Sequence, residues 1–152
     1  MQMKHVLDRV AIADQPTEDD LMAIKECGFV AVVNLRNHGE PEQPLSPAGE
    51  GEKAREIGLD YLHVGVGGAP LTREGVVAVI EFIELHSNRG DVLVHCRKGG
   101  RAAALVALRE AVKREWDAEQ AAARAKTELG VELEGGLRTM IENYLREHHS
   151  AS

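Results

Sequence analysis

Cys96 and Arg101 bracket a short segment, Cys-Arg-Lys-Gly-Gly-Arg, whose residue types can perform nucleophilic chemistry on an anion. A cysteine thiolate is a strong nucleophile, and an arginine guanidinium binds two oxygens of a phosphate or carboxylate at once. Between them, Gly99 and Gly100 permit the backbone angles with which successive amides turn toward one centre. The segment therefore predicts an anion cradle with Cys96 beneath it as the nucleophile, a thiolate at neutral pH.

The residue before this segment and the two basic residues within it are expected to assist the cradle. His95 is expected to hold the loop by hydrogen bonding rather than to transfer protons. Arg97 and Lys98 are expected to point outward, where they raise the positive potential and steer a substrate. The alternative is that Cys96 is a buried structural cysteine and that the loop is an ordinary turn between a strand and a helix.

Strands and helices alternate along the chain in an order that positions such a loop. The apolar stretch 91–95 predicts a central strand that ends at Cys96, and residues 102–115 predict a helix whose first amides face the cradle. Further strands are expected at 10–13, 29–35 and 60–64, and further helices at 17–28, 46–58, 72–88, 117–129 and 135–148. This alternation predicts an α/β domain with a mostly parallel sheet of about four strands.

Composition narrows the classes of function and partner. The chain has 152 residues, which fits a single domain over 1–152 with the helices of 117–148 packed on it. Its net charge of -7 predicts no general affinity for nucleic acid or an anionic membrane surface. No apolar stretch of signal-peptide or membrane-span length appears, so a cytoplasmic location is expected. The histidines, cysteines and carboxylates lack metal-ligand spacing, so neither a metal nor another cofactor is expected. The sequence does not predict the oligomeric state.

The pair His95-Cys96 followed by Arg101 resembles the signature of the cysteine-based phosphatases. The chain looks most similar to the bacterial beta-lactamase-hydrolase-like, phosphatase-like group, which itself resembles dual-specificity phosphatases and has four residues between the cysteine and the arginine. Three further stretches support the resemblance and extend it over residues 10 to about 130: Gln15-Pro16, Asn34-Leu35-Arg36 and Leu71-Thr72. The resemblance implies a three-layer α/β/α fold and carries the catalytic roles to Cys96 and Arg101, with Arg36 as a substrate-binding residue. A structural ion pair is the alternative role for Arg36.

Two departures from the phosphatase pattern concern the proton donor and the leaving thiol. The connection from Gly65 to Pro70 has no carboxylate where these enzymes have an aspartic acid. The loop after Arg36 could supply a substitute acid, provided that it folds over the cradle. The candidates for that acid are Glu40, Glu42 and His38, whose alternative role is that of solvated loop side chains. Ala102 replaces a Ser or Thr that helps the thiol to leave. Turnover is therefore expected to be slow or confined to good leaving groups.

Three functions remain open for this constellation. The first is hydrolysis of a phosphomonoester, phosphotyrosine included, through a cysteinyl-phosphate, with a phosphorylated small molecule or a phosphoprotein as substrate. The second is sulfur transfer through a Cys96 persulfide, because the spacing of Cys96, Gly99 and Arg101 also resembles a rhodanese loop. The third is a phosphate-binding module without catalysis.

Overall fold

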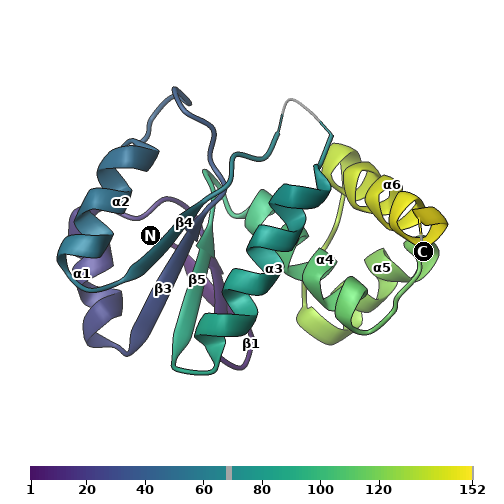
Figure 1. The fold of residues 1–152 in the computed structure, drawn as a ribbon, viewed down its shortest axis with the longest axis horizontal. Coiled ribbons are helices and arrows are strands. Elements are labelled where there is room, and N and C mark those ends of the chain that lie inside the picture. Colours follow the sequence, from purple (N-terminus) through teal and green to yellow (C-terminus); the bar gives the residue numbers. More distant parts are fainter. Residues whose placement is uncertain (68–69, 152) are drawn as a thin grey trace. The chain divides into compact units, whose positions relative to one another are not determined.

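A computed structural model describes residues 1–67 and 70–151 of the chain. The chain divides into two compact units, residues 1–102 and 103–152, each of which is described by itself. The first unit contains a sheet and its covering helices, and the second is helical (Figure 1).

Five strands of the described residues form the sheet, in the order β1-β2-β5-β3-β4. Their bounds are β1 Met3–Leu7, β2 Val10–Ala13, β3 Phe29–Asn34, β4 Asp60–His63 and β5 Asp91–His95. All neighbouring pairs are parallel except β1 with β2. His95 is in register with Ala13 on one side and Asn34 on the other, so the carboxyl ends of three parallel strands meet at one edge. Active sites of α/β sheets form at this edge.

Helices cover both faces of the sheet within the first unit. Helices α1 (Glu18–Glu26) and α2 (Pro47–Glu56) lie on one face, and α3 (Arg73–Ser87) lies on the other (Figure 1). Each begins at a side chain that accepts a backbone N–H of the first turn: Thr17, Ser46 and Thr72. Because the sheet is covered on both faces, the alternating side chains of β3 and β5 are all apolar between their ends, and Val32 and Leu93 are completely buried.

The predicted α/β class with a mostly parallel sheet is confirmed, with five strands rather than about four. The additional strand, β1, pairs antiparallel with β2 at the edge of the sheet. Its residues Met3, Lys4 and His5 are exposed, so the segment lacks the apolar pattern that marks the central strands. An edge strand of this kind gives little signal in the sequence.

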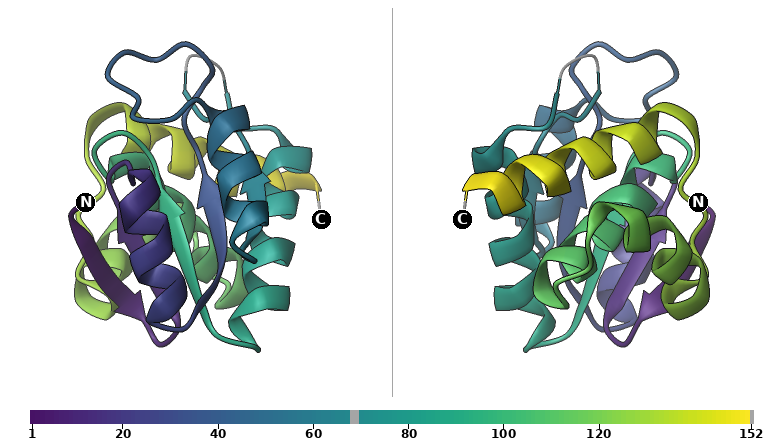
Figure 2. Two further views of the ribbon diagram at one scale, coloured as in Figure 1. Left: turned by 90° about the vertical axis from the view of Figure 1, so that its left-hand side faces the viewer. Right: turned by 90° about the vertical axis from the view of Figure 1, so that its right-hand side faces the viewer.

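The second unit is built from helices. It contains the residues of α4 (Gly100–Lys113) from Ala103 onward, then α5 (Ala118–Arg124), a π-helical turn over Ala125–Leu129, and α6 (Gly135–Ala151). Within this unit α5 packs against α6 (Figure 2), and the Arg114 guanidinium lies 5.4 Å from the centre of the buried Trp116 ring. The helix expected over 117–129 is thus interrupted in its second half. That the helices of 117–148 pack on the rest of the domain stays a prediction. None of the helices in the described ranges combines the length and apolar character needed to cross a membrane.

Candidate active site

The sulfur of Cys96 is the centre around which the loop after β5 turns. Cys96 is buried, and its backbone N–H donates to the Ala13 carbonyl at the end of β2 (3.3 Å). The sulfur accepts the N–H of Gly99 at 3.1 Å and that of Ala102 at 3.4 Å. Gly99 has φ of +99°, a left-handed angle that favours glycine and turns its amide inward. Two amides, one in the first turn of α4, therefore converge on the sulfur and favour its negative charge.

Arg101 is held at its outer end by a carboxylate that lies 61 residues away in the sequence. Its Nη1 donates to Glu40 Oε2 at 2.7 Å, and its Nη2 donates to Glu40 Oε1 at 2.8 Å. Nη1 also donates to the carbonyls of Val66 (2.9 Å) and Leu35 (3.4 Å). The pKa of Arg101 is raised above its usual value, first by the hydrogen bonds with Glu40 and then also by the nearby Cys96. Arg101 thus connects the Cys96 loop with two other segments, the one after β3 that contains Glu40 and the one after β4 that contains Val66.

Glu40 is ionised in this arrangement. The hydrogen bonds from Arg101 are the first cause that lowers the pKa of Glu40 from 4.5 to about 2, and the backbone N–H of Asn37 contributes to the same effect. A carboxyl group with such a pKa carries no proton at neutral pH. The geometry therefore favours an orienting role for Glu40 over that of a general acid.

The other two candidate acids lie on the same loop but have different partners. Glu42 is 75% exposed and pairs with Arg97, whose Nη2 is 3.0 Å from its Oε2. His38 is also exposed, and its ring meets the ring of His63 edge-on with centroids 4.9 Å apart. The structure thus directs Glu40 and Glu42 to two arginines of the Cys96 loop, whereas His38 contacts the end of β4.

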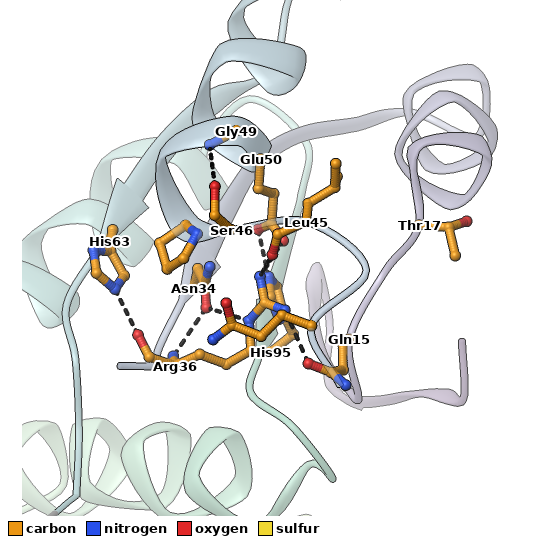
Figure 3. Close-up of polar contacts among 12 residues, drawn as sticks. Gln15, Thr17, Asn34, Arg36, Leu45, Ser46, Gly49, Glu50, His63 and His95 are labelled. Carbon is orange, nitrogen blue, oxygen red and sulfur yellow. Dashed lines mark hydrogen bonds and ion pairs between the residues drawn. The ribbon is translucent and has the colours of Figure 1, made fainter. Parts of the chain in front are cut away.

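Arg36 follows the end of β3 and is a completely buried cation, and Figure 3 shows its polar contacts. Its guanidinium donates to Glu50 Oε1 (2.8 Å), Gln15 Oε1 (2.9 Å), the Leu45 carbonyl (3.0 Å) and Asn34 Oδ1 (3.1 Å). A buried charge needs such a set of partners, because an unpaired one costs several kcal/mol. The geometry favours a structural ion pair for Arg36, the alternative to the substrate-binding role expected from the resemblance.

Glu50 joins this cation to His95, the residue before Cys96. Its second oxygen, Oε2, lies 2.6 Å from Nε2 of His95, and both side chains are completely buried. Nδ1 of His95 has no hydrogen-bond partner within residues 1–67 and 70–151. The Nε2–H tautomer suits this arrangement, because a carboxylate can only accept a hydrogen bond. The contact is consistent with the supporting role expected of His95.

Glu50 is not among the site residues predicted from the sequence, although the sequence contains a pattern that indicates its burial. The residues that α2 buries are Pro47, Glu50, Gly51 and Ala54, which follow the spacing of one helical face. A glutamate on the small-residue face of an amphipathic helix indicates a buried partner of opposite charge.

Lys98 and Gly100 complete the set of predicted residues. Lys98 is exposed and, with Lys4, Asp14 and Gly99, lines a shallow hollow of about 240 Å³ beside the loop. Gly100 is the first residue of α4. No cluster of three His, Cys, Asp or Glu side chains that could hold a metal is found in the described part of the chain.

The family is decided by a match over residues 2–113 to the model of the beta-lactamase hydrolase-like protein, phosphatase-like domain. The chain belongs to this family. The Beta-lactamase hydrolase-like protein of Xylella fastidiosa (strain Temecula1 / ATCC 700964) is 37% identical to the chain over 113 residues, which are 74% of this chain. The match spans only 26% of the length of that relative, so this phosphatase-like domain corresponds to about a quarter of it.

Solved structures share the fold of this phosphatase-like domain. The active form of Tk-PTP superposes with a TM-score of 0.74 at 22% identity, covering 95% of this chain and 96% of the other. PTPMT1 in complex with PI(5)P has a TM-score of 0.73 at 14% identity and covers 99% of each chain. At these identities the likeness shows the fold, and it confirms the expected relationship to the architecture of protein tyrosine and dual-specificity phosphatases.

Proposed function

We propose that this domain hydrolyses phosphomonoesters with Cys96 as the nucleophile. The observation that carries the proposal is the convergence of the Gly99 and Ala102 amides on the Cys96 sulfur, with the Arg101 guanidinium nearby. Membership of the phosphatase-like family supports the same reaction.

The reaction would proceed in two steps. The Cys96 thiolate attacks phosphorus, and the S–P bond forms as the bond from phosphorus to the ester oxygen breaks. Loop amides and the Nε side of Arg101, which Glu40 leaves open, stabilise the equatorial oxygens. Water then attacks the cysteinyl-phosphate, which releases inorganic phosphate and restores the thiolate.

The first step would favour substrates whose leaving oxygen departs as an anion. Glu40 is ionised, Glu42 pairs with Arg97, and the segment from Gly65 to Pro70 has no acidic residue, so these positions do not provide a ready proton donor. Aryl phosphates and phosphoanhydrides have such leaving groups. A phosphorylated small molecule is the favoured substrate class because the similarly folded PTPMT1 binds PI(5)P, and a phosphoprotein is the alternative.

Sulfur transfer is a second candidate, which the small size of the loop favours. Only four residues separate Cys96 from Arg101, and the sulfur already accepts two amides, so the loop suits a single added sulfur atom. With thiosulfate, the thiolate would take the outer sulfur as the S–S bond breaks and sulfite leaves. Cyanide would then remove this sulfur as thiocyanate.

Paired assays of the wild type and Cys96→Ser with p-nitrophenyl phosphate and with thiosulfate plus cyanide test these functions. Phosphate release that disappears in Cys96→Ser supports hydrolysis. Thiocyanate without phosphate release replaces hydrolysis with sulfur transfer. Anion binding without either product, unchanged in Cys96→Ser, replaces both with a phosphate-binding module.

A further inference from the structure

We propose that the shallow hollow beside the Cys96 loop binds a second anionic group of the substrate, a phosphate or a carboxylate, between Lys4 and Lys98. The proposal rests on the proposed phosphoester hydrolysis and names its substrate class. The favoured substrate is then a phosphomonoester whose organic part carries a further negative charge, in preference to one whose organic part is neutral.

The position of the hollow next to the nucleophile is the first argument. Gly99, whose N–H donates to the Cys96 sulfur at 3.1 Å, also lines the hollow. Ala13 lines it as well, and the Ala13 carbonyl accepts the backbone N–H of Cys96 at 3.3 Å. Two residues that are hydrogen-bonded to Cys96 therefore separate the cradle from the hollow, and one small molecule can reach both.

The cations at the hollow are the second argument. Lys98 has no hydrogen bond or ion pair within residues 1–67 and 70–151, whereas its neighbour Arg97 already has Glu42 as a counter-ion at 3.0 Å. Lys4 comes from a separate element, the edge strand β1, where it is in register with Ile12 of β2. Two lysines thus line one hollow in a chain whose net charge is -7. Ammonium groups bind phosphate and carboxylate oxygens through charge-assisted hydrogen bonds, so this lining suits an anion.

Asp14 contributes the acidic side chain among the described residues that line the hollow, and it has a structural partner. Its Oδ1 accepts the N–H of Gln2 at 2.7 Å, and its own N–H donates to the Gln2 carbonyl at 3.2 Å. These hydrogen bonds hold the start of β1 against the end of β2, and so they fix the strand that carries Lys4. The Asp14 carboxylate offsets the charge of one lysine, which leaves a net positive charge at the hollow.

The size of the hollow favours a subsite over a site for a separate molecule. Its volume is about 240 Å³. Pockets that hold a whole small-molecule ligand usually measure about 300 to 1,000 Å³. A group that is tethered to a phosphoryl group in the cradle needs fewer contacts than a free ligand, because the cradle already holds the molecule. The hollow therefore suits one part of a substrate.

Paired aryl phosphates test the proposal. Each pair has an alkyl chain at the meta position of the phenyl ring, and the chain ends in a carboxylate in one member and in a neutral carboxamide in the other. The alkyl chain insulates the ring, so both members have the same leaving phenol. In-line attack puts the leaving oxygen opposite the sulfur, and a set of chains of increasing length allows the second group to turn back toward the loop. A phosphonate in place of the carboxylate shows which anion fits better.

The wild type should prefer the acid at the best chain length. We expect kcat/KM for the acid to exceed that for the amide by about 3-fold to 20-fold, because each ion pair with an exposed lysine adds a few-fold. The gain should lie mainly in KM, since these contacts form equally in the ground state and the transition state. Added salt should reduce the preference.

Substitutions of the lining residues should change this preference in opposite directions. Lys4→Gln and Lys98→Gln should each lower the ratio of kcat/KM for acid and amide, and the double variant should bring it close to one. Asp14→Asn retains a hydrogen-bond acceptor and removes the opposing charge, so it should raise the ratio. Lys25→Gln is the matched control, because Lys25 Nζ donates to the Gly58 carbonyl before β4, at the opposite edge of the sheet, and it should keep the wild-type ratio.

Three results would overturn the proposal. A wild-type ratio near one shows that the hollow takes no part in substrate binding. A preference that survives in the double variant of Lys4 and Lys98 places the recognising cation elsewhere, for example at Arg97. An equal loss in Lys25→Gln reveals a general effect of the charge of the protein.

Calorimetry keeps this assignment separate from the hydrolysis itself. If the wild type cleaves neither member of any pair, the proposed hydrolysis fails, and the affinities of the same compounds decide the role of the hollow. Binding of the acid that is a few-fold tighter than binding of the amide, and is equal to it in the double variant, supports the subsite. Equal affinities for the wild type, or no binding of the acid, overturn it. Circular dichroism establishes that each variant is folded.

Discussion

Glu50 Oε2 lies 2.6 Å from Nε2 of His95, the residue directly before Cys96, and both side chains are completely buried. Because the other oxygen of Glu50 binds Arg36, one carboxylate supports a buried cation and the end of the central strand together. We therefore expect substitution of Glu50 to lower the stability of the folded domain.

Replacing Glu50 by Gln should lower the free energy of unfolding by about 3 kcal/mol, since it leaves the Arg36 charge buried without a counter-ion. Urea unfolding followed by circular dichroism measures this loss. Glu52→Gln, on the exposed side of the same helix, should change the value by less than about 0.5 kcal/mol. Equal effects of the two substitutions would show that the buried ion pair does not stabilise the fold.

The ion pair of Glu40 with Arg101 should make stability depend on pH in the acid range. The pKa of Glu40 falls from 4.5 to about 2 on folding, so the folded state binds fewer protons than the unfolded state between these values. The stabilisation is therefore complete above 4.5 and is lost as the pH falls toward 2. Urea unfolding of the wild type and Glu40→Gln across this range should show a difference that shrinks at low pH. A constant difference would contradict the assigned pKa.

The substitution Gly99→Ala should destabilise the loop because residue 99 has a positive φ angle. The φ of +99° is unfavourable for alanine, while the nearest atom to an added Cβ, the Ala13 carbonyl oxygen, is at an ordinary distance of 3.8 Å. We expect a loss of about 1 to 2 kcal/mol in thermal unfolding, together with weaker tungstate binding. Gly136→Ala is the control, because Gly136 lies in a helix with open space around it, and it should leave stability unchanged or slightly higher.

Hydrolysis should depend strongly on the leaving group. A series of aryl phosphates should show kcat/KM falling steeply as the pKa of the phenol rises, because ionised Glu40 supplies no proton to the departing oxygen. Steady-state kinetics with at least five phenols measures the slope. A flat dependence would reveal a proton donor among the remaining groups of the chain.

Local signals in the sequence were sufficient for most of the secondary structure. Thr17, Ser46 and Thr72 each cap the helix expected from them, because capping involves residues only three positions apart. The Cys96 loop was predictable for the same reason, since its strand, glycines and helix are contiguous. The strand β1 escaped prediction because its stabilisation comes from pairing with β2 and not from its own composition.

The partners of the arginines were not predictable in this way. Arg101 and Glu40 are 61 residues apart, and Arg36 and Glu50 are 14 residues apart with a loop between them. Arg101 and Glu40 meet because the parallel strands β5 and β3 end at one edge of the sheet. Arg36 and Glu50 meet because Glu50 lies on the buried face of α2. A charge at a strand end therefore indicates the edge of a site, while its partner and role depend on the folded chain.

The ends of β2, β3 and β5 meet in a buried network that includes Glu50, and this network limits the positions at which substitutions can change the substrate preference. Gln15 after β2, Arg36 after β3 and His95 at the end of β5 all depend on the same buried network, so a substitution at any of these positions disturbs the others. The exposed side chains of His38 and Glu42 are not part of this buried network. In a library selected for new substrates, surviving variants should accumulate at His38 and Glu42, while the buried network of Gln15, Arg36, Glu50 and His95 should remain unchanged.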